Sequence, residues 1–308
     1  MQVLRHVARA GILPPAPVVA LGNFDGVHIG HQRVLQRAAE LARDRDSRPV
    51  AVTFCRPRSA ATGDQDAALL IESLRQRLRR IAALGFDTII IERLSRQWST
   101  PAAASELREL LISGLGVKTL VCGRGIEFGG DREGGSECLA AAARGCGLDV
   151  EIADSVFVGG VEVHSAVVRR ALLAGDLVTA RAMLGRHPEV SGRVRRGFQR
   201  GRTIGFPTAN LRVSGVALPP NGVYAVRVRV GERLYGGVAN LGVNPTFGGD
   251  QRALEPHIFD FNGDLYGQRL DVQFVEALRA ERRFPSVDEL ARQIARDVEA
   301  ARAILERA

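Results

Sequence analysis

The sequence predicts a doubly wound α/β domain followed by a small antiparallel β-barrel with a closing helix. Three observations predict this class. In the first half of the 308 residues, short runs rich in Val and Ile alternate with helical patterns, as in parallel sheets of βαβ units. After residue 184 the segments become short and alternating, with Gly, Asn, Asp and Pro between them, which is typical of a barrel. The last segment repeats apolar residues at helical spacing.

Strands and helices alternate regularly along the first half. The predicted strands are 17–24, 49–54, 87–94 and 117–123. The predicted helices are 32–44, 69–85 and 105–116. The first helix places five apolar residues on one face, which is the spacing of a stripe that packs on a sheet. These residues are Val34, Leu35, Ala38, Leu41 and Ala42. This part therefore has the pattern of a Rossmann-like domain.

The second half consists of short segments that alternate apolar and polar residues. They are 191–197, 224–230, 233–242, 257–261 and 269–278. A closing amphipathic helix is expected over 286–308, because Ser286 and Glu289 have the spacing of a capping box. The texture changes near Gly185 to Pro188, so the expected domains are 1–184 and 185–308.

Composition excludes several classes of protein. With 45% hydrophobic and 25% charged residues, the chain resembles a soluble globular protein, and no stretch approaches the roughly 20 apolar residues of a membrane helix. The N-terminus lacks the pattern of a secretory signal, so we expect a cytoplasmic protein with no membrane partner. Whether the chain forms a homo-oligomer stays open.

The net charge of +8 comes from arginines spread along the whole chain, with Lys118 as the sole lysine. This distribution predicts compositional bias and no nucleic-acid partner. A phosphate must then be held by backbone amides, arginines, histidines or a metal, because no lysine follows a glycine-rich loop. The four cysteines have no metal-ligand spacing and are predicted to be reduced, buried thiols. They are Cys55, Cys122, Cys138 and Cys146.

The first candidate site is the turn between the first strong strand and its helix. His28 and His31 lie three apart where the helix begins, so both can face one anion at the positive end of the helix dipole. Such a pair can stabilise charge on an α-phosphate during nucleotidyl transfer, and we predict that both are catalytic. The nucleotide-binding candidates of the turn are Gly22, Asn23, Phe24, Asp25 and Gly30.

This turn with its HxGH motif resembles the HxGH nucleotidylyltransferases. GNFDGVHIGH in particular resembles the FMN adenylyltransferase module of the bacterial bifunctional riboflavin kinase/FAD synthetase family, and the resemblance covers essentially the whole chain. It implies conversion of FMN to FAD with ATP. The segment 163–169 matches the family's nucleotide-binding ISSTxIR, and there the resemblance implies that Ser165 and Arg169 bind the nucleotide.

Three segments of this module depart from the family's pattern. Residues 53–58 lack the histidine of TFxPHP, 122–129 carry Gly125 and Glu127 in a segment similar to VGxDFRFG, and 163–169 has lost most polar groups. Each lost charge-assisted contact costs roughly 1.5–3 kcal/mol. Three interpretations stay open: a weakened adenylyltransferase, a module for another nucleotide or flavin analogue, and a non-catalytic nucleotide- or flavin-binding scaffold.

The second candidate site is the glycine-rich segment that opens the barrel. Its glycines let the backbone wrap a polyphosphate closely, although by spacing alone a structural hairpin is an equal alternative. Thr208 and Asn210 are two apart in an extended segment, and their oxygens suit Mg²⁺. The nucleotide-binding candidates are Gly192, Gly197, Gly201, Arg202, Gly205 and Pro207.

GRTIGFPTAN at 201–210 closely resembles the riboflavin kinase signature GRxxGFPTAN. The resemblance implies phosphorylation of riboflavin to FMN with ATP and Mg²⁺. It implies that Thr208 and Asn210 hold Mg–ATP and that Glu255 is the base for the ribityl 5′-hydroxyl. The flavin-binding candidates are Asn240, Arg279 and Phe284.

Two features receive no function from the sequence. Trp98 is interpreted as a packed aromatic residue, and the arginines from Arg75 to Arg80 as a solvated helix face.

Overall fold

The computed structural model describes most of the chain. The described residues are 1–5, 16–55, 69–93, 105, 111, 115–126, 128, 135–196, 201, 204–243 and 252–308. They form two compact units. Unit 1 consists of Met1–Ala68 and Leu74–Val167, and unit 2 of Leu69–Ser73 and Val168–Ala308. Trp98 and most of the predicted helix 105–116 lie outside the described residues.

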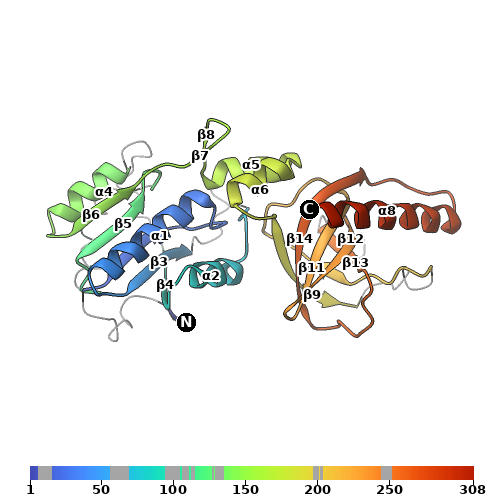
Figure 1. Cartoon of the computed structure of the whole chain (residues 1–308), viewed down its shortest axis with the longest axis horizontal. Coiled ribbons are helices and arrows are strands. Elements are labelled where there is room, and N and C mark those ends of the chain that lie inside the picture. The colour runs from blue at the N-terminus through green and yellow to red at the C-terminus, as the bar shows by residue number, and fades with distance from the viewer. Residues whose placement is uncertain are drawn as a thin grey trace. The chain divides into compact units, whose positions relative to one another are not determined.

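Unit 1 contains a six-stranded parallel sheet in the order β1-β4-β3-β2-β5-β6. Figure 1 labels β3, β4, β5 and β6 of this sheet. Its strands are β1 (Gln2–Arg5), β2 (Val18–Gly22), β3 (Pro49–Cys55), β4 (Thr88–Arg93), β5 (Thr119–Gly123) and β6 (Asp149–Ala153). The strand order changes direction between β2 and β5, and ligands of doubly wound sheets bind outside the carboxyl ends of the strands at such a switch point. The predicted α/β class is confirmed.

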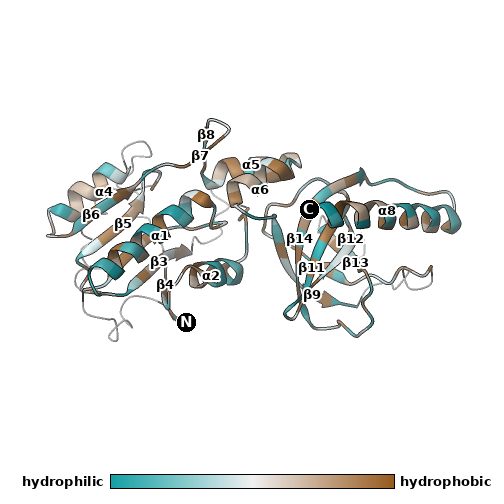
Figure 2. Cartoon of the chain, viewed as in Figure 1, coloured by the Kyte–Doolittle hydropathy of each residue, from teal (hydrophilic) through white to brown (hydrophobic). Residues whose placement is uncertain are grey.

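Both faces of this sheet are buried, as is usual for parallel sheets. Along β2, Val19 and Leu21 pack in one apolar cluster, while Val18 and Ala20 pack in another. Helix α1 (Ile29–Asp44) buries the five apolar residues that its period predicts. In Figure 2, α1 shows hydrophilic and hydrophobic residues side by side along its length, as an amphipathic helix does.

The other elements up to residue 184 are mostly short. Helix α2 (Leu74–Ala83) begins later than predicted, because residues 69–73 belong to unit 2, where Leu70 forms a parallel bridge with Val216. The remaining elements are α4 (Gly135–Arg144), β7 (Phe157–Val158), β8 (Val161–Glu162), α5 (Ser165–Ala174) and α6 (Leu177–Leu184). Helix α6 ends at Gly185, which adopts the left-handed conformation with φ 69°.

Unit 2 contains a closed barrel in which neighbouring strands are antiparallel, in the order β10-β13-β12-β11-β14-β9. Its strands are β9 (Glu189–Arg195), β10 (Asn210–Arg212), β11 (Gly222–Val230), β12 (Arg233–Val243), β13 (Arg252–Ile258) and β14 (Arg269–Ala280). Helix α8 (Val287–Arg307) packs on β11, β12 and β14. Its N-cap Ser286 accepts a hydrogen bond from the Glu289 amide, which confirms the predicted cap.

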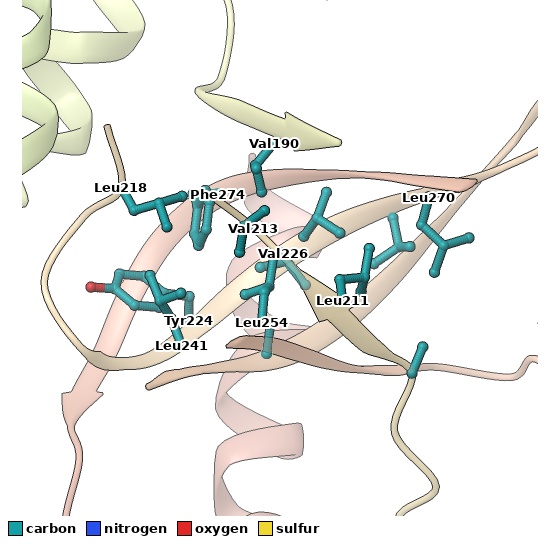
Figure 3. Packing of buried hydrophobic residues seen from close by; sticks show 14 of the residues in the cluster. Val190, Leu211, Val213, Leu218, Tyr224, Val226, Leu241, Leu254, Leu270 and Phe274 are labelled. Atoms are coloured by element: carbon teal, nitrogen blue, oxygen red, sulfur yellow. The ribbon is translucent and has the colours of Figure 1, made fainter. Parts of the chain in front are cut away.

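The barrel interior is filled with apolar side chains (Figure 3). Leu211, Val226 and Leu254 come from three different strands and are fully buried. Tyr224 packs edge-on against Phe274, with ring centroids 5.3 Å apart, and its hydroxyl donates to the Pro220 carbonyl. A fully buried side chain of this kind contributes about 1.5–3 kcal/mol to the stability of the fold. The packed core therefore supports the residues at the end of the barrel.

The two compact units divide within α5, between Val167 and Val168, whereas the sequence placed the domain boundary after α6. Buried residues of α6 explain the difference, since Leu177 belongs to the apolar cluster of the barrel. Among the described residues, no helix has the length and hydropathy needed to cross a membrane.

Candidate active sites

The turn between β2 and α1 has an unusual backbone. Phe24, Gly26 and Val27 all have positive φ, at 50°, 84° and 37°. Non-glycine residues in this region cost about 1–3 kcal/mol each and persist only where the surroundings hold them. At Gly22, which ends β2, a Cβ would lie 3.0 Å from the Phe24 ring, so any larger residue would push this ring aside. The turn is therefore strained and closely packed against the end of β2.

The two predicted catalytic histidines lie together where α1 begins. His28 is the N-cap residue, and its Nδ1 accepts a hydrogen bond from the His31 amide at 3.3 Å. The two rings stack with centroids 3.6 Å apart. A Cβ at Gly30 would lie 3.1 Å from the Val163 carbonyl oxygen, so glycine permits this close approach. The pair thus occupies the positive end of the helix dipole, where an anion would be stabilised.

Other predicted residues of this site support the turn from behind. Asp25 is 5% exposed and forms an ion pair with Arg77 at 3.5 Å. Ser165 Oγ donates to the Asp25 carbonyl at 3.0 Å, and Thr53 Oγ1 donates to the Asn23 carbonyl at 2.9 Å. The Asp25 carboxylate thus faces a cation of the protein. These contacts hold Asp25 within the turn, and direct nucleotide contact by Asp25 stays a prediction.

Arg169 takes part in a different contact. Its Nε donates to the Leu69 carbonyl at 2.7 Å within unit 2.

The divergent segments are only partly described: residues 56–58, Glu127 and Gly129 lie outside the described residues. Cys122 is buried, and burial raises the pKa of its thiol to about 12. The predicted burial is wrong for Cys138, which is exposed on α4, and Cys146 is only half-buried.

The barrel site joins the GFPTAN segment to strand β13. Asn210 Nδ2 donates to Glu255 Oε1 at 2.9 Å, and the Ala209 amide donates to the Pro256 carbonyl at 2.9 Å. Thr208 lies two positions before Asn210 and is exposed. The family resemblance placed these residues in one site, and the structure brings Asn210 and Glu255 into direct contact.

His257 also belongs to this site, although the sequence gave it no role. Its Nδ1 lies 2.8 Å from the Pro207 carbonyl oxygen, which can only accept, so this nitrogen donates. The Phe206 ring packs edge-on against the imidazole at 5.6 Å. A signal was present: His257 is two residues after Glu255 on a strand and therefore lies on the same face.

The glycines of the segment have different roles. A Cβ at Gly201 would lie 2.3 Å from the Phe206 carbonyl oxygen and 3.5 Å from Thr208 Oγ1, so glycine is needed where the backbone closes beside Thr208. Gly205 has a positive φ of 86°. A Cβ at Gly192 would lie 2.9 Å from the Leu211 side chain, so that glycine serves packing inside the barrel. Gly197 and Arg202 lie outside the described residues.

The flavin-binding candidates form two groups. Asn240 is paired with Glu255 across β12 and β13, and its Nδ2 lies 3.3 Å from Glu281 Oε1. Arg279 instead forms an ion pair at 2.8 Å with the buried Asp297 of α8, and it lies over the Phe284 ring at 5.6 Å. Asn240 is thus next to the predicted base, whereas Arg279 and Phe284 fix the connection between β14 and α8.

The donor atoms of the barrel site suit a magnesium ion. The described residues contain no group of three His, Cys, Asp or Glu side chains that could hold a metal ion. The Asn210 amide contacts the Glu255 carboxylate, and Thr208 supplies a hydroxyl two residues before Asn210, so the segment carries hard oxygen ligands. Mg²⁺ prefers such oxygens and keeps several waters, because protein cages rarely complete its octahedron.

Comparison with known protein families covers both halves of the chain. A family model described as riboflavin kinase matches residues 184–305, and one described as FAD synthetase matches residues 13–167. The two matches correspond to the barrel with α8 and to the parallel sheet with the His28 turn.

Individual relatives match along nearly the whole chain. A Haemophilus influenzae protein is 38% identical over 307 residues, covering 98% of this chain and 99% of the relative. An Escherichia coli K12 protein is 40% identical over 287 residues, covering 92% and 91%. Both are named bifunctional riboflavin kinase/FMN adenylyltransferase. A Streptococcus pneumoniae crystal structure titled macrolide-efflux protein is 31% identical with a TM-score of 0.84, covering 98% of this chain and 99% of that one.

Proposed function

Because the chain belongs to the bifunctional riboflavin kinase/FMN adenylyltransferase family, we propose which of its residues carry each of the two reactions. The chain is a transferase: one module phosphorylates riboflavin to FMN with ATP, and the other adenylylates FMN to FAD. Of the three interpretations of the divergent module, a retained adenylyltransferase is the one that the FAD synthetase match supports. The two modules are proposed as residues 1–184 and 185–308, acting on small molecules in the cytoplasm.

In the kinase reaction, Glu255 accepts the proton of the ribityl 5′-hydroxyl as the oxygen attacks the γ-phosphate of ATP and ADP leaves. The observation that carries this proposal is the hydrogen bond from Asn210 to Glu255 Oε1. It fixes one carboxylate oxygen and thereby the orientation of the proposed base. Phosphoryl transfer needs positioning, a metal and a proton acceptor, and this module has residues for all three.

Thr208 and the Asn210 carbonyl oxygen would hold Mg²⁺, which neutralises charge on the phosphates of ATP when bound. The GFPTAN backbone, with Gly201, Gly205 and Pro207, would enclose the phosphates. Asn240 is proposed to contact the flavin next to Glu255, since the two residues are cross-strand partners. Arg279 and Phe284 are proposed to form the flavin-side wall through the segment that they stabilise.

In the adenylyltransferase reaction, a phosphate oxygen of FMN attacks the α-phosphate of ATP and pyrophosphate leaves. His28 and His31 donate hydrogen bonds as negative charge develops on the α-phosphate, and the amides where α1 begins add to this stabilisation. No covalent intermediate with the protein is required. Gly22, Asn23, Phe24 and Gly30 shape the turn around the phosphates, while Ser165 supports it through the Asp25 carbonyl.

A single assay separates the two reactions. The full chain is incubated with riboflavin, ATP and Mg²⁺, and the flavins are separated by chromatography. We expect both FMN and FAD from the natural sequence, and FMN alone from His31→Gln. That variant keeps the His31 backbone amide that the N-cap uses. FAD formation by His31→Gln at the natural rate would contradict the proposed role of His31, and failure of the natural chain to make FAD would contradict the adenylyltransferase assignment.

A further inference from the structure

Arg77 does not belong to the solvated helix face that the sequence predicts for residues 75–80. It is 3% exposed, whereas Arg75 on the same helix is exposed. The periodicity explains this position, because Arg77 lies with Leu74, Leu78 and Ile81 at the spacing of the apolar stripe of α2. A buried guanidinium stays charged and therefore needs partners that satisfy it.

The partners of Arg77 lie at the ends of two neighbouring strands. Its Nη1 donates to the Phe54 carbonyl at 3.2 Å and lies 3.5 Å from Thr53 Oγ1, near the end of β3. Its Nη2 lies 3.5 Å from Asp25 Oδ1, in the turn after β2. Thr53 in turn donates to the Asn23 carbonyl. One side chain thus links α2 to the turn at two points, directly through Asp25 and indirectly through Thr53.

A buried ion pair of this kind is a poor means of stabilising a fold, since its desolvation offsets most of its attraction. It does fix geometry, and the turn that it contacts needs fixing. Phe24 and Val27 have positive φ, which their side chains disfavour, and Asp25 lies between them. Without an anchor at Asp25, the backbone would relax toward ordinary conformations, and the amides and histidines that follow would move with it.

We propose that Arg77 is a positioning residue for FMN adenylyl transfer. It touches no substrate. Through Asp25 and Thr53 it holds the strained turn in the shape that aims the His28–His31 pair and the α1 amides at the α-phosphate of ATP. This inference rests on the proposed function of that turn. Misplacement of catalytic groups by about 1 Å can cost about 10²-fold in rate, so a small relaxation of the turn would be measurable.

The test compares Arg77→Met with Arg75→Met in the full chain. Both substitutions remove one arginine charge from α2, but only the first breaks the contacts with the turn. Conversion of FMN to FAD with ATP and Mg²⁺ is measured first, and conversion of riboflavin to FMN by the same preparation serves as the internal control. We expect about a 10²-fold lower kcat for FAD formation in Arg77→Met, with an unchanged KM for FMN and unchanged kinase activity.

Arg77→Lys should be intermediate, since an ammonium can pair with Asp25 but lacks the planar fork that reaches the other acceptors. This partial rescue would not follow from loss of folding alone, and a thermal melt of each variant identifies the temperature at which unit 1 is folded. Arg75→Met should match the natural chain in both reactions. A folded Arg77→Met that makes FAD at the natural rate would overturn the proposal.

If Arg77→Met does not fold, the double variant Asp25→Asn/Arg77→Met removes both charges, which is far less costly than leaving one buried and unpaired. A folded double variant with slow FAD formation supports positioning, and one with the natural rate overturns it. Failure of the proposed function is distinguishable, because the natural chain would then make no FAD or His31→Gln would leave FAD formation unchanged.

Discussion

The amide nitrogen of Asn210 lies 2.9 Å from a carboxylate oxygen of Glu255, although the two residues are 45 positions apart in the sequence. The register of the barrel produces this contact. Leu211 pairs with Leu254 and Arg212 with Ala253 in the antiparallel ladder between β10 and β13, so Asn210 and Glu255 are the next pair. The closed barrel therefore aligns a proposed metal ligand with the proposed base, and neither side chain depends on a flexible loop for its position.

Glu255→Gln should remove the base but keep the contact, because the Gln carbonyl oxygen can still accept from Asn210. We expect FMN formation from riboflavin to fall by about 10²–10⁴-fold, the usual contribution of a general base, with little change in the melting temperature. Conversion of added FMN to FAD by the same variant is the control and should be unaffected. A Glu255→Gln chain that phosphorylates riboflavin at the natural rate would show that another group accepts the proton.

His257 should contribute to ATP binding through Pro207. Proline has no amide hydrogen, so the backbone ladder cannot continue past Ala209, and the His257 ring binds the one polar backbone group that Pro207 retains. His257→Phe keeps the ring packing against Phe206 and removes the donor. A lost hydrogen bond of about 1 kcal/mol predicts roughly a fivefold higher KM for Mg–ATP in the kinase reaction.

His257→Asn is the matched variant for this prediction, because its amide can place a donor where Nδ1 lies. It should restore most of the affinity for Mg–ATP. The KM for riboflavin should stay the same in both variants, since the contact is on the nucleotide side of Glu255. Equal increases in the two KM values, or no difference between Phe and Asn, would argue against this role.

The sequence predicted features that depend on a local motif or on regular spacing of apolar residues. It did not predict positions that depend on contacts between distant parts of the chain. The β2 strand, the stripe of α1 and the Ser286 cap follow from local rules, and the structure has all three. The burial of Arg77 was not predicted, because a charged residue is expected to be exposed even at a position of the apolar stripe. Its partner Asp25 lies 52 positions away in the sequence, so local spacing gives no sign of the ion pair. Residues 69–73 were predicted as the start of a helix, but they belong to unit 2 because Leu70 pairs with residues near Val216. Such a distant pairing cannot be read from the local periodicity of the sequence.

Two glycines of β12 should differ sharply in their tolerance of alanine. A Cβ at Gly237 would lie 2.7 Å from the His257 carbonyl oxygen, which is part of the barrel backbone and cannot move alone. A Cβ at Gly242 would lie 2.0 Å from a carboxylate oxygen of Glu281, an exposed side chain that can rotate away. We expect Gly237→Ala to cost about 1–3 kcal/mol of stability and Gly242→Ala about 0.5 kcal/mol or less.

Calorimetric melting of the barrel transition checks this difference, with kinase activity below the transition as a test of folding. Gly242→Ala should also break the contact between Asn240 and Glu281 without unfolding the strand. Similar losses of stability in the two variants would mean that the backbone at Gly237 can adjust, contrary to the packing argued here.

His187, between α6 and β9, should make the stability of unit 2 depend on pH. Burial, followed by the positive charges of Arg181 and Arg227, lowers the pKa of this imidazole below its ordinary value. The unfolded chain therefore binds the proton more readily than the folded one. Above about pH 6.5 the imidazole is neutral in both states, and its titration does not lower the free energy of unfolding. As the pH falls from there toward the lower folded pKa, the unfolded chain takes up the proton first, and the free energy of unfolding decreases.

Melting temperatures of the barrel transition at pH 7.5 and 5.5 test this expectation in the natural chain and in His187→Gln. The variant cannot take up a proton, so its melting temperature should fall less between the two pH values. His164→Gln, which changes an exposed histidine of unit 1, should keep the natural pH dependence of the barrel transition. An equally steep loss in His187→Gln would assign the acid sensitivity of the barrel to its carboxylates, because these also gain protons as the pH falls.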